Sequence, residues 1–207
     1  MKIEKINSIR NRLKSNSYLV YNDKDEGILI DAGVELADVK KFNINIKAIL
    51  LTHCHFDHIM FLNELQKYYS CQIYISIMDK LGLLNQDINL SKAFHKILDF
   101  SGMKNNIITF NDNEILNIAD ISIKCILTPG HTAGSACFLI GKNLFSGGTL
   151  FAQSIGRTDL PTSYYLQQKS SLKRLDNLDY NILYPGHDRI SNKEEQIKNI
   201  KFWLSIN

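Results

Sequence analysis

The stretch that decides the fold is Thr52-His53-Cys54-His55-Phe56-Asp57-His58. It places three histidines and an aspartate within a few residues, and imidazole together with carboxylate suits zinc, iron or manganese. His53 and His55 are two residues apart, so an extended backbone would put both on one side of the chain. Asp57 and His58 follow a predicted turn into a helix and would approach from another direction. The cluster therefore predicts a transition-metal site.

Two further histidines follow the same dipeptide, Pro-Gly. One lies in the segment TPGHTAGS at 128–135 and the other in YPGHD at 184–188. A Pro-Gly pair favours a tight turn, because proline fixes its own φ and glycine reaches positive φ without strain. We expect each turn to hold its histidine, His131 or His187, at the end of a strand.

The remaining chain alternates predicted strands and helices. Apolar, β-branched runs predict strands at 17–20, 28–30, 46–51, 72–75, 107–110, 114–118, 121–127, 136–140, 143–145 and 182–184. Helices are expected at 34–42, 59–69, 91–100, 163–175 and 192–204. His95 falls in the middle of the third helix and is interpreted as an ordinary side chain. Ser191 and Glu194 resemble a capping box at the start of the last helix.

Composition predicts an ordinary globular chain. With 207 residues, 44% apolar and 22% charged, we expect one domain over 1–207. A net charge of +3 without a basic run gives no nucleic-acid footprint. The absence of a long apolar run predicts no membrane partner. Four cysteines without a CxxC pair, and a start without an apolar leader core, predict reduced thiols and a cytoplasmic location. The oligomeric state stays open.

The three histidine motifs resemble those of the metallo-β-lactamase superfamily. They are 52–58, 128–132 and 184–187, in the order in which the family carries them. The resemblance implies an α/β (α+β) fold, the αββα four-layer sandwich, with the metal site at one edge of two packed sheets. It also implies two groups of metal ligands. The first is His53, His55 and His131, and the second is Asp57, His58 and His187.

Within that superfamily the segments 145–151 and 156–161 resemble a single-domain bacterial branch of glyoxalase II-like (hydroxyacylglutathione hydrolase-like) enzymes. This resemblance implies hydrolysis of a small-molecule thioester by a metal-activated water, with one or two zinc ions. Iron or manganese would also be compatible. Asp57 would orient or deprotonate the water as well as ligate. Full-length glyoxalase II enzymes have a C-terminal helical domain that binds glutathione. The chain ends soon after His187, so we do not carry over glutathione specificity.

One position departs from the family. The superfamily has an aspartate that bridges both metals, and the matching position is Gly148. Glycine has no side-chain donor, so we expect a weaker second metal and impaired activity. Arg157 is a candidate to bind an anionic group of the substrate, since guanidinium suits carboxylates. The alternative is that Arg157 pairs with Asp159 within its own loop.

Three functions therefore stay open at the level of sequence. The first is a metal-dependent thioester hydrolase. The second is an iron-dependent oxygenation of a persulfide on the same scaffold, in the manner of persulfide dioxygenases. The third is a catalytically inactive metal-binding protein, and Gly148 is the reason to consider it.

Overall fold

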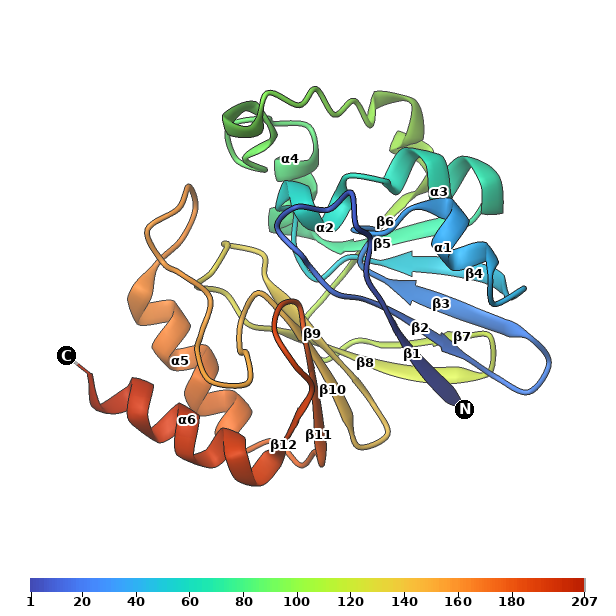
Figure 1. Cartoon of the computed structure of the whole chain (residues 1–207). Helices are drawn as coiled ribbons and strands as arrows, with labels where there is room; N and C mark the ends of the chain where they lie inside the picture. The colour runs from blue at the N-terminus through green and yellow to red at the C-terminus, as the bar shows by residue number, and fades with distance from the viewer. Residues whose placement is uncertain (207) are drawn as a thin grey trace.

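The strands of the computed structural model, which describes residues 1–206, form two six-stranded sheets (Figure 1). The first has the order β1-β2-β3-β4-β5-β6 and comprises β1 (Lys2–Ile6), β2 (Ser17–Tyr21), β3 (Glu26–Ile30), β4 (Asn45–Leu50), β5 (Gln72–Ser76) and β6 (Ile107–Phe110). The second has the order β12-β11-β10-β9-β8-β7 and comprises β7 (Ile115–Ile118), β8 (Ile121–Leu127), β9 (Ala136–Ile140), β10 (Asn143–Gly147), β11 (Ile182–Pro185) and β12 (Ser191–Asn192).

Helices cover the outer faces of both sheets (Figure 1). On the first sheet they are α1 (Leu36–Lys40), α2 (Phe56–Ile59), α3 (Leu62–Tyr69) and α4 (Ile77–Leu83). Two 3₁₀ turns, η1 (Ser91–Phe94) and η2 (Ser101–Asn106), follow α4. On the second sheet they are α5 (Tyr165–Asp176) and α6 (Lys193–Ser205). The layers are helix, sheet, sheet and helix, as the resemblance implied.

Alternation along the strands builds the packed layers. In β2, Leu19 packs in the core between the first sheet and its helices, while Tyr18 and Val20 face the second sheet. In β4, Ile49 and Leu50 divide in the same way. Successive side chains of a strand point to opposite faces, so one apolar strand supplies two cores. A third core lies between the second sheet and α5 and α6.

Several predicted elements were wrong in detail. The helix expected at 91–100 is only the short turn η1, and His95 ends it with a φ of 54° rather than lying mid-helix. The helix at 59–69 begins earlier and is broken into α2 and α3. The cap of α6 is Asn192 rather than Ser191: the Asn192 side chain accepts a hydrogen bond from the Glu195 N–H, while the Ser191 hydroxyl accepts one from the Gln196 side chain. Helix α4 was not predicted.

All four cysteines are buried and free, which confirms that they form no disulfide. Among residues 1–206, no helix combines the length and the apolar character that crossing a membrane requires.

Candidate metal centre

Loops that follow β4, β8 and β11 carry the predicted site to one edge of the two sheets. His53 and His55 lie in the loop after β4, and His55 is the residue before α2, so Asp57 falls in the first turn of that helix. His131 follows Gly130, whose φ is 141°. A Cβ at Gly130 would lie 2.4 Å from the backbone of α5, so this turn requires glycine.

The first half-site consists of histidines alone. The ligand atoms of His53, His55 and His131 lie within 4.8 Å of one another, and all three residues are buried. His55 Nδ1 is 3.0 Å from His131 Nε2. Burial lowers the pKa of all three imidazoles, that of His131 to about 4. The rings are therefore neutral at pH 7, the form in which imidazole binds a metal ion.

The second half-site contains a carboxylate. Asp57 Oδ2 lies 3.2 Å from His187 Nε2 and 3.5 Å from His58 Nε2. Burial alone would raise the pKa of Asp57, but the facing imidazoles of His58 and His187 hold it below its usual range. Burial would likewise lower the pKa of His58, but Asp57 and Asp31 raise it overall. This half-site is charged where the first is neutral.

Asp31, at the end of β3, orients one histidine of each half-site. Its carboxylate accepts hydrogen bonds from His58 Nδ1 (2.8 Å) and from the Thr52 hydroxyl (2.9 Å). Because the Thr52 hydroxyl donates to Asp31, it accepts from His53 Nδ1 at 2.9 Å. Both rings then present an unprotonated Nε2 to the centre of the site. Such outer partners set the tautomer of metal-binding histidines.

His131 is oriented by a backbone carbonyl. Its Nδ1 donates to the oxygen of Arg157 at 2.9 Å, which leaves Nε2 free as a donor atom for a metal. The ring lies between two glycines. A Cβ on Gly148 would be 2.2 Å from His131 Cδ2, and one on Gly156 would be 2.8 Å from its Nδ1. The side of Gly148 that would carry a side chain therefore faces His131.

The six side chains fit a transition cation. Free imidazole nitrogens converge in one group, and two imidazoles meet a carboxylate in the other. These are the donor types that zinc and iron take in proteins. Cys54 lies in neither group, and its side chain packs in the core of the first sheet.

A cavity of about 340 Å³ opens on the two half-sites. Half of the residues that line it are apolar: Leu13, Phe56, Leu90, Ala93, Phe94 and Leu160. Arg157 also lines the cavity, but its guanidinium makes two 2.7 Å contacts with the carboxylate of Asp159. The structure therefore has the ion pair between Arg157 and Asp159 that the sequence analysis gave as the alternative to substrate binding.

Two buried aspartates were missed from the sequence. Asp31 could have been found from the sequence, because it comes after the predicted strand at 28–30. His53 comes in the same way after the predicted strand at 46–51. Asp79 had no such signal, since it lies in the unpredicted α4. Its carboxylate accepts hydrogen bonds from the Cys54 N–H (2.9 Å), the Thr132 hydroxyl (2.8 Å) and the Gly134 N–H (2.7 Å). Asp79 thereby ties together the two loops of the first half-site.

Comparison with known families identifies the class. The model of the metallo-β-lactamase superfamily matches residues 10–187, so the chain belongs to that superfamily. A probable metallo-hydrolase of Methanocaldococcus jannaschii is 33% identical over 86% of this chain and 90% of its own length.

Two further relatives are named as hydrolases. A probable polyketide biosynthesis zinc-dependent hydrolase of Bacillus subtilis is 26% identical over 95% of this chain and 84% of its own length. The hydroxyacylglutathione hydrolase GloC of Haemophilus influenzae is 29% identical, over 84% and 85% respectively. With the histidine-rich site, these matches support a metal-dependent hydrolase.

Solved structures agree on the fold. A B3 metallo-β-lactamase superposes with a TM-score of 0.83 at 26% identity, covering 99% of this chain and 100% of that one. A protein crystallised in a di-iron-bound form gives a TM-score of 0.81 at 26% identity, covering 96% of this chain and 99% of that one. The αββα sandwich is therefore shown by sequence and by structure.

Proposed function

We propose that this chain hydrolyses a small thioester. The observation that carries the proposal is that two donor groups, one of histidines alone and one with a carboxylate, open on a single cavity of about 340 Å³. A cavity of this size suits a small acyl thioester. The likeness to a hydroxyacylglutathione hydrolase supports the same choice of substrate.

In this proposal each half-site holds one cation. His53, His55 and His131 would bind the first, with one position left open, as in catalytic zinc sites. Asp57, His58 and His187 would bind the second. Zinc is our first choice, and the di-iron relative makes iron an alternative beside manganese. When bound, the metal lowers the pKa of a coordinated water towards about 7 and polarises the scissile carbonyl.

Residues of the chain itself orient the attacking water and exclude bulk water. Asp57 stays anionic at neutral pH because its pKa is low, so it can hold the second cation and orient the attacking water by accepting a hydrogen bond from it. Leu13, Phe56 and Phe94 exclude bulk water from the reacting carbonyl.

The cavity wall favours a thiolate as the leaving group. Among the described residues, Arg157 is the one titratable side chain in the lining outside the two donor groups, and Asp159 holds it. The wall therefore offers no additional acid to protonate a departing group. A thiol with a pKa of about 8.5 leaves as its anion without one, whereas an amine does not.

The test uses the lactoyl thioester of N-acetylcysteamine, with thiol release followed at pH 7. Chains loaded with zinc, iron or manganese should release the thiol, and His53→Ala should lose more than about 100-fold in kcat/KM. Lys40→Ala, on the exposed face of α1, is the matched control. A chain that binds metal at full occupancy but releases no thiol would overturn the proposal.

One observation favours a second candidate, the iron-dependent oxygenation of a persulfide. Asp57, His58 and His187 are two imidazoles and one carboxylate, the donor set of non-haem iron oxygenases. Oxygen uptake by the iron-loaded chain with a small persulfide, and none with the zinc-loaded chain, would support this candidate over the hydrolase.

A further inference from the structure

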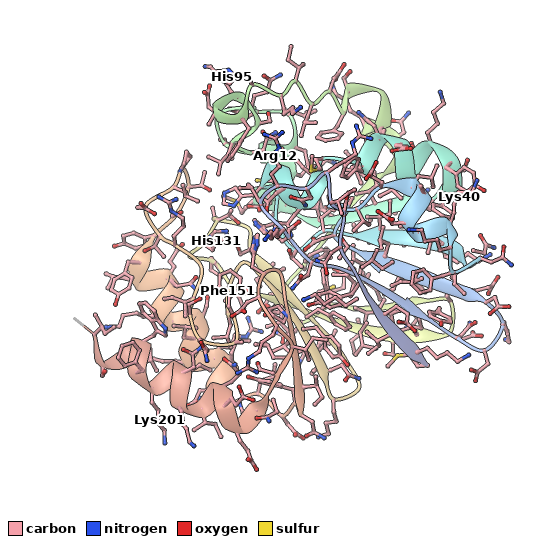
Figure 2. All side chains as sticks on the ribbon, in the orientation of Figure 1. Arg12, Lys40, His95, His131, Phe151 and Lys201 are labelled. Carbon is pink, nitrogen blue, oxygen red and sulfur yellow. The ribbon has the colours of Figure 1, made fainter. Side chains whose placement is uncertain are left out.

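The segment from Ile9 to Lys14, between β1 and β2, carries positive charge close to the metal centre. Arg10 in this segment is paired with Glu35 at 2.8 Å. Arg12 is exposed and forms no ion pair within residues 1–206. Its neighbour Leu13 lines the metal-centre cavity. In the view of Figure 2 the labelled Arg12 lies between His131 and His95.

A second cavity adjoins that of the metal centre. We call it the outer cavity. It holds about 750 Å³ and is lined by Ile9, Arg10, Arg12, Leu13, Phe56, Met60, Phe61, Phe94 and Lys96. Leu13, Phe56 and Phe94 line both cavities. The rings of Phe56 and Phe94 stack with centroids 4.6 Å apart, so one aromatic wall is shared by the two spaces.

All charged side chains that line the outer cavity are positive. Its lining contains three cations and no acid. Glu35 neutralises Arg10, while Arg12 and Lys96 form no ion pair within the part of the chain that the structure describes. A hollow lined by charge of one sign concentrates ligands of the opposite sign. Arg157, by contrast, lines the inner cavity as half of an ion pair.

We infer that Arg12 and Lys96 bind an anionic group, carboxylate or phosphate, on the thiol portion of the substrate. This inference rests on the proposed thioester hydrolysis. With the scissile carbonyl at the two half-sites, the thiol portion passes the Phe56–Phe94 wall and reaches the outer cavity. Its apolar stem contacts Leu13 and the aromatic rings, and its anion meets the two cations.

Matched pairs of lactoyl thioesters test the inference. One pair is pantetheine and 4′-phosphopantetheine, which differ by a phosphate. The other is N-acetylcysteinylglycine and its C-terminal amide, which differ by a carboxylate. We expect kcat/KM of the metal-loaded chain to be about tenfold higher for the charged member of at least one pair. The pair with the larger ratio identifies the kind of anion.

Variants assign the preference to residues. The double variant Arg12→Gln, Lys96→Gln should reduce the ratio to about one while it leaves the neutral thioesters unchanged. Arg12→Lys should retain part of the ratio, since it keeps the charge. Lys40→Gln, on α1 and labelled in Figure 2, should retain all of it.

A binding measurement separates this inference from the proposed function. The S-methyl thioethers of the same thiols cannot be hydrolysed, and calorimetry reports their affinity for the metal-loaded chain. If no thioester is hydrolysed but the charged thioethers bind more tightly through Arg12 and Lys96, the hydrolase proposal fails and the anion site stands. Equal hydrolysis of the charged and neutral members, or equal losses in the double variant, would overturn the anion site alone.

Discussion

The two half-sites of the metal centre are held in place by different means. His53, His55 and His131 are all buried, and Asp79 links their two loops from within α4. In the second half-site Asp57 and His58 are equally buried, but the His187 side chain is 33% exposed.

The segment before β2 supports the second half-site. Asn11 and Ser15 donate to the Asp57 carbonyl at 2.8 and 2.7 Å, and Asn16 donates to the Pro185 and Asp188 carbonyls, both at 2.9 Å. The first half-site is thus neutral and linked through Asp79, whereas the second is charged and is supported by buried polar side chains of the segment before β2. This difference predicts that the two cations are bound with different affinities.

Removing one ligand from each half-site should have the largest effect. His131→Ala should abolish the first cation site and lower thioester turnover by more than about 100-fold. His187→Ala should remove the second cation while the first remains. Metal analysis of both purified variants, beside turnover, measures the difference. Equal metal loss in the two variants would show that the half-sites bind as one unit.

Restoring a carboxylate between the half-sites is the next test. Gly148→Asp should tighten the second cation by at least about tenfold, because a bridging anion offsets the repulsion between two cations. The variant must also displace the His131 ring, which a Cβ at 148 would touch. Gly148→Ala adds that contact without the charge and is the matched control. If turnover is the same in all three proteins, Gly148 does not limit the natural site.

Asp79→Asn should weaken the first half-site selectively. An amide cannot accept all three hydrogen bonds that the Asp79 carboxylate accepts, so a buried donor is left unpaired at a cost of about 1–3 kcal/mol. We expect about a 10–100-fold lower affinity for the first cation. Asp31→Asn should weaken both cations, because Asp31 contacts His58 directly and His53 through Thr52. Titration against a chromophoric chelator distinguishes the two patterns.

Asn16→Ala should have the smallest effect. It removes one of the two side-chain donors to the Asp188 carbonyl, to which Lys5 Nζ still donates at 2.8 Å, and Tyr18 still donates to the Pro185 carbonyl. A loss of about 1 kcal/mol corresponds to a lower Tm by about 2–4 °C. We expect the second cation to bind more weakly and the first to be unchanged. Thermal unfolding with and without zinc tests this, and a loss confined to the first cation would contradict it.

Much of the fold was predictable because its signals are local. The apolar runs predicted the strands, and the alternation of side chains along a strand then places residues such as Leu19 and Tyr18 on opposite faces. The prediction of a helix at 91–100 was wrong because the apolar residues there make other contacts. Phe94 stacks on Phe56 in the wall of the cavity instead of packing a helix onto a sheet. Local periodicity carries no information about such a partner.

The sequence by itself determined the donor types, the metal chemistry and the superfamily. The reason is that each of the three motifs, His53 to His58 and the two Pro-Gly-His turns, is a short unbroken stretch of sequence. Only the tertiary structure decided how those donors are held. Asp31, Asp79 and Asn16 support the loops of the site through hydrogen bonds to residues far away in the sequence, from 21 residues for Asp31 and Thr52 to 172 for Asn16 and Asp188. Contacts of that kind depend on which strand ends the two sheets bring together, and no local pattern in the chain encodes them.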